Sequence, residues 1–231
     1  MKARLLFNAL FCRVAPVVCL LGLSALLSGC KTWRLSDPVT GPGYQPENYY
    51  HSFKVLPVSV RRVACLPATC DSNQAELLAG LESLDSVVVE EFGKTQKFEV
   101  VTVTPGQLRA WIGRSSIRAE EALPANLLEI LKEKLQCDGV LFSKLTRYRA
   151  FPPLAVGFSF KLAEADTADL LWAADEVFDA TDERVVNSAR RYQLSREQLP
   201  PALADSRSIL NSPSGFGRYA ASSLFQTLPV R

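Results

Sequence analysis

The sequence predicts an α/β fold: a single, three-layer-like sandwich in which helices pack on a mixed sheet of about five strands. Three observations support this fold class. A strand, a helix and a strand follow one another between residues 62 and 103, which is typical of a βαβ unit with parallel strands. Three strand patterns with turn-rich joints follow between residues 138 and 179, which indicates an antiparallel meander. An amphipathic helix near residue 231 is predicted to pack back on the sheet.

The βαβ unit begins with the β-rich run 62–69. Asp71 is predicted to cap the next helix, with Gln74 three residues later as in a capping box. Apolar residues then recur at helical spacing until Gly93, which is predicted to end the helix. The run "FEVVTV", residues 98–103, is predicted to be the second strand.

Two helices are predicted between this unit and the meander. The first begins at Pro105, since proline suits the first turn of a helix. The second covers 124–136 and carries leucines on one side. The third strand follows and opens with residues 140–142, "VLF", which are apolar on both faces as in a central strand.

The rest of the sheet comes from two further runs. Alternate residues of 156–162 are apolar, and "DLLWAADEVFDA", residues 169–180, is predicted to be the fifth strand. Thr181 is predicted to cap a short helix after it. Ser212 is predicted to cap the last helix, with Pro213 in its first position.

The N-terminus predicts export. A basic start and a short apolar run, residues 14–27, precede small residues, which is the pattern of a signal peptide over residues 1–29. The run Leu27–Cys30, "LSGC", resembles the lipobox of bacterial lipoproteins. That resemblance implies a fatty-acylated Cys30, a membrane attachment through this lipid and a domain that faces the periplasm. Lys31 indicates sorting to the outer membrane, and retention at the inner membrane stays open.

Charge and composition limit the partners of the mature chain. Residues 1–29 contain three basic residues and no acidic one, so their removal changes the net charge from +2 to −1. A nearly neutral protein gives no reason to expect nucleic acid as a partner. Residues 30–60 are rich in Pro and Gly and are predicted to form a flexible linker. The folded domain is predicted over 61–231.

The cysteines leave one question open. Cys65 and Cys70 are close in sequence, and the envelope is oxidising, so a disulfide between them is a candidate. The alternative is that both are small apolar residues packed in or near a strand. Cys137 is predicted to be buried.

The sequence gives little support for catalysis. It has no GxSxG motif and no Gly-rich phosphate loop, and its one histidine, His51, lies in the predicted linker. No metal and no cofactor are expected. Eight carboxylates between residues 164 and 183 could bind calcium or hydrolyse a cell-wall sugar. Solvated strand faces and turns explain them better, because no calcium-loop motif is present.

A candidate interaction patch lies at the end of the third strand. Arg147 and Arg149 are predicted to point to one face of the strand and Tyr148 to the other. In the envelope such residues could bind a partner protein or the carboxylates of peptidoglycan. Ordinary surface charge is the alternative reading.

The layout resembles one group of envelope lipoproteins, the LpoB, CsgG and GNA-type group, which shares the fold of the TolB N-terminal domain. The group's L-G-A-D-x-V/L pattern is matched by Leu135–Val140, "LQCDGV", and its D-x-x-T-G-x-x-L-W pattern by the altered turn that precedes Trp172. The resemblance implies a compact α/β sandwich that acts as a non-catalytic binding or assembly module, such as an accessory factor for an envelope synthase or transport machine. An oligomeric secretion channel of the CsgG type is the alternative. The joint 149–158 is too short for the long hairpin that channel-forming members carry.

Overall fold

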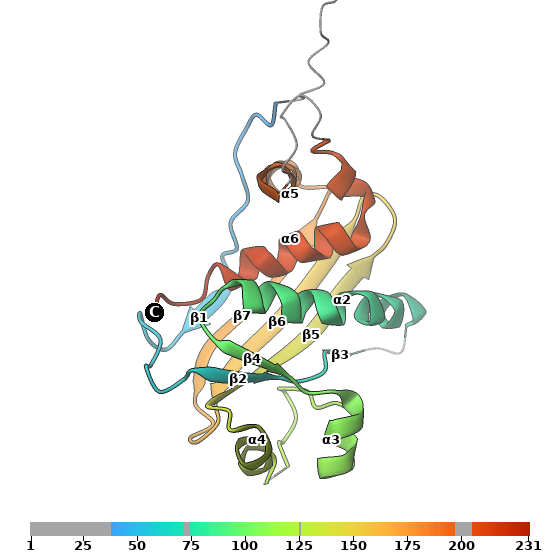
Figure 1. Ribbon diagram of the computed structural model, residues 1–231. Helices are drawn as coiled ribbons and strands as arrows, with labels where there is room; N and C mark the ends of the chain where they lie inside the picture. The colour runs from blue at the N-terminus through green and yellow to red at the C-terminus, as the bar shows by residue number, and fades with distance from the viewer. Residues whose placement is uncertain (1–37, 72–73, 125, 197–204) are drawn as a thin grey trace, which may run out of the picture. The chain divides into compact units, whose positions relative to one another are not determined.

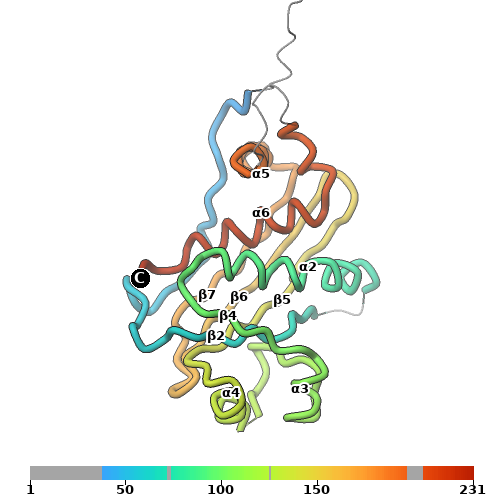
Figure 2. The backbone as a smooth tube through the Cα atoms, in the orientation of Figure 1, coloured from blue at the N-terminus to red at the C-terminus, as the bar shows by residue number. Residues whose placement is uncertain are grey.

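A seven-stranded mixed sheet lies at the centre of the computed structural model (Figures 1 and 2). The structure describes residues 38–71, 74–124, 126–196 and 205–231. Six strands follow the order β1-β7-β6-β5-β2-β4, and the short β3 pairs with β5. Their bounds are β1 (Tyr49–His51), β2 (Arg62–Cys65), β3 (Thr69–Cys70), β4 (Glu99–Thr102), β5 (Gly139–Arg149), β6 (Ala155–Glu164) and β7 (Leu170–Asp179).

The strand directions confirm the predicted topology. The strands β2 and β4 are parallel and are joined by helix α2 (Ala75–Lys94), so they form the expected βαβ unit. The strands β5, β6 and β7 form the expected antiparallel meander. Strand β5 also runs parallel to β2, which makes it a central strand. The sheet exceeds the expected five strands because β1 and β3 are present as well.

Helices lie on both faces of the sheet, as the predicted sandwich requires (Figure 1). One core lies between the meander and helices α2 and α6 (Pro213–Phe225), and the other lies beneath α3 (Pro105–Ile112) and α4 (Leu127–Leu135). Because successive side chains of a strand point to opposite faces of the sheet, one strand contributes residues to both cores. For example, Cys65 packs in the first core and its neighbour Ala64 in the second. Helix α5 (Glu183–Arg196) and a 3₁₀ turn (Ser208–Asn211) precede α6.

The predicted starts of two helices are confirmed. The Ser212 side chain accepts a hydrogen bond from the Gly215 N–H at 3.1 Å, and Pro213 is the first residue of α6. Pro105 likewise begins α3, where Thr104 and Gln107 form a reciprocal capping box. Such caps satisfy N–H groups that have no partner within the helix.

Two predicted limits of α2 are wrong. The helix begins after Gln74 without a side-chain cap, because the Asp71 carboxylate forms an ion pair with Lys144 on β5 at 2.7 Å. A tertiary ion pair therefore replaces the expected capping interaction. The helix also continues through Gly93 to Lys94. A glycine near the end of a packed helix weakens it by only about 1 kcal/mol, which packing can offset.

The predicted cap of α5 is wrong by one residue. The helix begins at Glu183, so Asp182 and not Thr181 precedes it. The Asp182 carboxylate accepts a hydrogen bond from the Arg184 N–H at 2.8 Å, as an N-cap residue does.

Residues from Gly41 to Val60 do not form the predicted flexible linker. The Tyr44 N–H donates to the Arg184 carbonyl at 3.1 Å, and β1 pairs with β7. Leu56 and Val60 are buried in the first core. The compact unit therefore starts at Pro38 rather than near residue 61.

The predicted signal peptide, residues 1–29, and Cys30 lie outside the described residues. None of the helices in the described part of the chain combines the length and the apolar character needed to cross a bilayer.

Candidate interaction surface

The three residues of the candidate interaction patch lie on two faces of β5, with Arg147 and Arg149 on one face and Tyr148 on the other, as the strand pattern predicts. A bulge in β5 after Leu145 lets Tyr148 face α2, where its hydroxyl lies 3.5 Å from the Ser83 Oγ. Arg149 lies on the opposite face and forms an ion pair with Asp179 at 2.9 Å. Arg147 is exposed on that opposite face. The three side chains therefore do not form one surface.

Cys65 and Cys70 do not form the candidate disulfide, so the alternative of two small residues in or near a strand describes them. Cys65 lies opposite Leu141 of β5, whereas Cys70 lies opposite Leu145, four residues further along the same strand. That separation is about 13 Å, and a disulfide needs Cα atoms within about 7 Å. Burial raises the pKa of the Cys65 thiol, so it stays protonated at neutral pH. Cys137 is buried, as predicted.

The acidic segment 164–183 does not converge on one site. Asp166 pairs with Lys132, and Asp179 pairs with Arg149. Glu176 instead accepts hydrogen bonds from two backbone N–H groups at 3.2 and 3.3 Å. In the described part of the chain, no three His, Cys, Asp or Glu side chains gather where a metal ion could bind.

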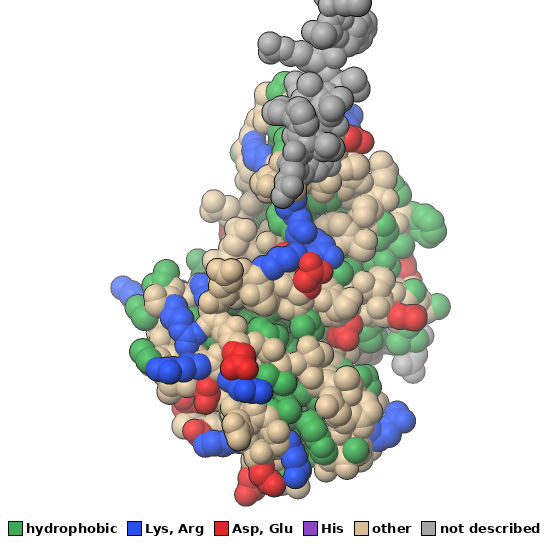
Figure 3. Space-filling view, in the orientation of Figure 1, with side chains coloured by type: hydrophobic (Ala, Val, Ile, Leu, Met, Phe, Trp, Pro, Cys, Tyr) green, Lys and Arg blue, Asp and Glu red, His purple; other side chains and the backbone are tan. Residues whose placement is uncertain are grey.

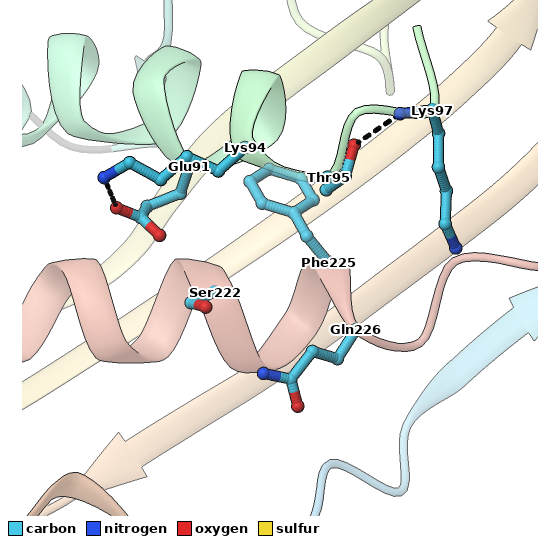
Figure 4. Close-up of a pocket in the computed structure, with 7 residues that line it drawn as sticks. All are labelled: Glu91, Lys94, Thr95, Lys97, Ser222, Phe225 and Gln226. Carbon is cyan, nitrogen blue, oxygen red and sulfur yellow. Dashed lines mark hydrogen bonds and ion pairs between the residues drawn. The ribbon is translucent and has the colours of Figure 1, made fainter. Parts of the chain in front are cut away.

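A polar pocket of about 380 Å³ lies between the C-terminal ends of α2 and α6 (Figure 4). Figure 4 shows Lys97 beside this pocket. Its Nζ donates to the carbonyls of Leu228 and Pro229 at 2.7 and 2.8 Å. Burial lowers the pKa of Lys97. The Lys97 ammonium group is therefore already bound by backbone carbonyls of the protein. The pocket is lined by Glu91, Lys94, Thr95, Lys97, Ser222, Phe225 and Gln226.

The carboxylate of Glu91 ties three helices together beside the pocket. It is only 3% exposed and pairs with Lys94 at 2.7 Å, Arg218 at 3.0 Å and Arg196 at 3.2 Å. Burial opposes its ionisation, but hydrogen bonds from Lys94 and Arg218 outweigh burial and hold the pKa of Glu91 below its usual value. These residues come from α2, α5 and α6, so the cluster joins the helices that cover the first core.

Glu90 extends the same cluster at the surface. Its carboxylate lies 2.6 Å from both Lys94 and Arg218, and hydrogen bonds from Arg218 and Lys94 lower its pKa to about 2. Figure 3 shows basic side chains meeting an acidic one over α6 on this face. The cationic groups beside the pocket are thus engaged by the protein itself, which favours a structural role for the cluster.

A different feature distinguishes the side of the domain formed by β1. Ten large apolar side chains are exposed in the described residues, and six of them lie on β1, on the chain that follows it as far as Val55, or next to these segments. Tyr50 is 56% exposed and Val55 is 54% exposed. Figure 3 shows apolar side chains on the side of the domain where the chain ends. We call the six the β1 edge surface: Tyr49, Tyr50, Phe53, Val55, Leu170 and Val230.

Long-range hydrogen bonds hold this surface in place. The Asp175 N–H donates to the Asn48 carbonyl at 3.0 Å, and the Ser52 N–H donates to the Leu171 carbonyl at 3.1 Å. The Leu56 N–H donates to the Val230 carbonyl at 2.8 Å. The exposed residues are therefore displayed on a segment that is fixed at both ends.

Among the described residues, no strand pairs with the outer edge of β1. In an antiparallel pair, alternate residues direct their backbone groups toward the partner strand. Asn48 and Ser52 face β7, so the carbonyl of Tyr49 and both backbone groups of His51 face away from it. Exposed apolar side chains beside an open strand edge are a typical binding surface for another polypeptide.

Sequence reasoning missed this surface because the segment reads as a linker. One feature of the local sequence does indicate a strand here: Tyr49, Tyr50 and Phe53 are aromatic, and aromatic residues favour strands and are unusual in a flexible linker.

No protein-family model and no curated protein sequence matches the chain. Its fold is similar to several solved structures. The PelC dodecamer from Paraburkholderia phytofirmans is 12% identical, with a TM-score of 0.42, over 79% of this chain and 98% of that chain. The lipoprotein GNA1162 from Neisseria meningitidis is 13% identical, with a TM-score of 0.38, over 60% of this chain and 99% of that chain.

The LpoB C-terminal domain from Escherichia coli is 16% identical, with a TM-score of 0.35, over 52% of this chain and 84% of that chain. LpoB and the GNA lipoprotein belong to the group that the sequence resembles. TM-scores below 0.5 denote a distant resemblance, so neither the fold nor the function of this chain is inferred from these structures.

Proposed function

We propose that this protein is a lipid-anchored, non-catalytic binding and assembly module of a bacterial cell envelope, attached to the outer membrane and facing the periplasm. The observation that carries the binding role is the β1 edge surface, where six exposed apolar residues lie on β1 or next to the chain that follows it, and no described strand pairs with the outer edge of β1. Exposure of these apolar side chains to water is unfavourable, and their burial against a partner would remove this cost.

The anchor rests on the sequence. The apolar run before Leu27–Cys30 and the small residues within that motif support acylation at Cys30. A Cys30→Ala variant should lose metabolic labelling with palmitate and should leave the membrane fraction or remain an unprocessed precursor. Labelling equal to that of the parent would overturn the anchor.

Sorting to the outer membrane rests on Lys31. A Lys31→Asp variant should shift the protein toward the inner-membrane fraction of a sucrose gradient, because Asp at this position marks retention in the enterobacterial pattern. Lys31→Gln is the matched control, since it removes the same positive charge without adding a carboxylate. Equal distribution of both variants would contradict the sorting proposal.

The binding role is tested in intact cells by a photo-crosslinking amino acid at position 50. We expect crosslinked products that contain a protein and that are absent when the same residue replaces Phe151. Phe151 is 79% exposed but lies in the turn between β5 and β6, away from the surface. Failure of position 50 to crosslink any protein, or the same products from both positions, would contradict the role.

A further inference from the structure

We infer that the partner of the β1 edge surface is a second copy of the same chain, bound about a two-fold axis with the two β1 strands antiparallel. The two sheets then continue across the interface. This inference rests on the proposed binding role and names the partner for it. A two-fold interface requires a surface that is complementary to itself, and β1 meets that requirement in its backbone, its apolar side chains and its charges.

The backbone supplies the first argument. The outward carbonyl of Tyr49 and the outward groups of His51 can pair with the same groups of a second β1. Between Asn48 and Phe53 there is no Lys, Pro or charged residue. Natural sheet edges that must stay monomeric usually carry such residues, because they prevent pairing with another strand.

The opposite edge of the sheet, formed by β4, carries charged side chains that disfavour pairing with another strand. On β4, Glu99 is 63% exposed and forms an ion pair with Arg62 at 3.0 Å. The Arg231 guanidinium lies 5.6 Å from the centre of the Phe98 ring and donates to the Val60 carbonyl at 2.8 Å. Charged side chains thus lie on β4 and beside its first residue, which disfavours a ring or fibre in which β1 of one copy pairs with β4 of the next.

Charge complementarity supplies the second argument. Glu47 and Lys54 flank the uncharged run, both are exposed, and neither forms an ion pair within the described residues. When two strands run antiparallel about a two-fold axis, Glu47 of each copy approaches Lys54 of the other. Two favourable pairs of opposite charge then border the apolar centre.

The hydrogen-bond pattern limits the register. Only odd-numbered residues of β1 direct backbone groups outward, so an odd residue must face an odd residue. Two registers keep Lys54 of one copy within one residue of the position opposite Glu47 of the other. In one register Tyr50 faces Tyr50, and in the other His51 faces His51.

Single cysteine substitutions test both registers in the full chain extracted in detergent. Under mild oxidation, either Tyr50→Cys or His51→Cys should form a covalent dimer at least about tenfold faster than Phe151→Cys, because the interface raises the local thiol concentration. The wild-type chain under the same oxidation reports any dimer made through its own cysteines. No excess dimer from either variant would overturn the inference.

Light scattering gives a second readout that needs no new cysteine. The wild-type chain should have the mass of a dimer, and the double variant Tyr49→Lys, Tyr50→Lys should have that of a monomer, since four like charges would meet at the interface. Leu78→Lys replaces an exposed apolar residue on α2 and should leave the dimer intact. A monomeric wild type, or a double variant that stays dimeric, would overturn the inference.

The outcomes separate this inference from the proposed function. If position 50 crosslinks only other envelope proteins while Tyr50→Cys and His51→Cys stay monomeric, the binding role stands and self-association is wrong. If position 50 crosslinks only lipid, the surface contacts the membrane and both the self-association and the protein-binding role are wrong. Labelling of Cys30 is unaffected in either case.

Discussion

Gly80 of α2 lies directly against the ring of Tyr148 of β5. A Cβ atom on Gly80 would come within 2.5 Å of the Tyr148 Cγ, which is closer than real Cβ contacts allow. The helix therefore approaches the sheet closely because this position has no side chain. Tyr148, which the sequence placed in an interaction patch, instead helps to position α2.

A Gly80→Ala substitution should consequently destabilise the protein by about 1–3 kcal/mol, because the added methyl group overpacks the contact with Tyr148. Gly93→Ala is the matched control on the same helix, where an added Cβ meets nothing within 4 Å. Alanine there should stabilise the helix by up to about 1 kcal/mol. Urea unfolding measures both, and equal effects at the two positions would contradict the close approach.

Glu91 and Glu90 give a second pair of adjacent test positions. Glu91→Gln should destabilise the protein by about 3 kcal/mol, because the 3% exposed carboxylate is the shared partner of Lys94, Arg196 and Arg218. Glu90 is 49% exposed, so Glu90→Gln should cost under about 1 kcal/mol. If both variants lost the same free energy of unfolding in a denaturant titration, the burial of Glu91 would not be what distinguishes it from Glu90.

The same carboxylates predict how stability depends on pH. Hydrogen bonds from Arg218 and Lys94 lower the pKa of Glu90 from 4.5 to about 2, and the pKa of Glu91 is also below 4.5. A depressed pKa in the folded state contributes stability above the unfolded value that is lost as the pH falls through the folded value. The free energy of unfolding should therefore fall between pH 4.5 and about pH 2. It should fall less steeply in the double variant Glu90→Gln, Glu91→Gln, and parallel curves for the two proteins would refute this prediction.

Two residues with positive φ predict stabilising substitutions. Gln136 has a φ of 52° and Ala168 a φ of 62°, a region that costs residues with a Cβ about 1–2 kcal/mol. Gln136→Gly and Ala168→Gly should each raise the free energy of unfolding by up to about 1 kcal/mol, since glycine adopts this region without that cost. Ala110→Gly in α3 is the control and should destabilise by about 1 kcal/mol. A loss of stability at all three positions would show that the backbone conformation does not decide the effect.

The two positions also explain a feature of the sequence patterns. In the group that the chain resembles, the L-G-A-D pattern has glycine where this chain has Gln136, and the T-G pair has glycine where it has Ala168. Each position adopts a positive φ here. Asp138 of the first pattern accepts hydrogen bonds from the N–H groups of Arg61 and Arg62, both at 2.9 Å. The resemblance therefore rests on backbone requirements at the ends of helices and strands, which many functions share.

Local patterns were sufficient for most of the fold. The helix that includes Leu84 and the strand that includes Phe160 repeat apolar residues at 3.6- and 2-residue spacing, and both are confirmed. Strand β1 could not be found in this way, because all three of its residues are exposed and its pairing partner is more than 120 residues away. Asp71 was assigned as a helix cap for a related reason, since its ion pair with Lys144 is invisible to local sequence.

The ion-pair cluster of Glu91 could be predicted only in part. Glu90, Glu91 and Lys94 are spaced to pair along one helix, so their sequence already indicates an interaction. Arg196 and Arg218 join them only because α5 and α6 pack beside α2. The candidate interaction surface was missed for the opposite reason: its residues are exposed, and exposure leaves no periodic pattern.

The docking of Gly41 and Tyr44 against α5 limits how far the domain can lie from an anchor at Cys30. Arg191 donates to the Gly41 carbonyl, and the Tyr44 N–H donates to the Ser188 Oγ at 2.8 Å. If Cys30 is the anchored residue, the chain from Cys30 to Gly41 can span at most about 40 Å. If the chain were undocked as far as Arg61, the span from Cys30 could reach about 110 Å. The domain then stays in a thin layer next to the bilayer, and it can bind only proteins that are present in that layer.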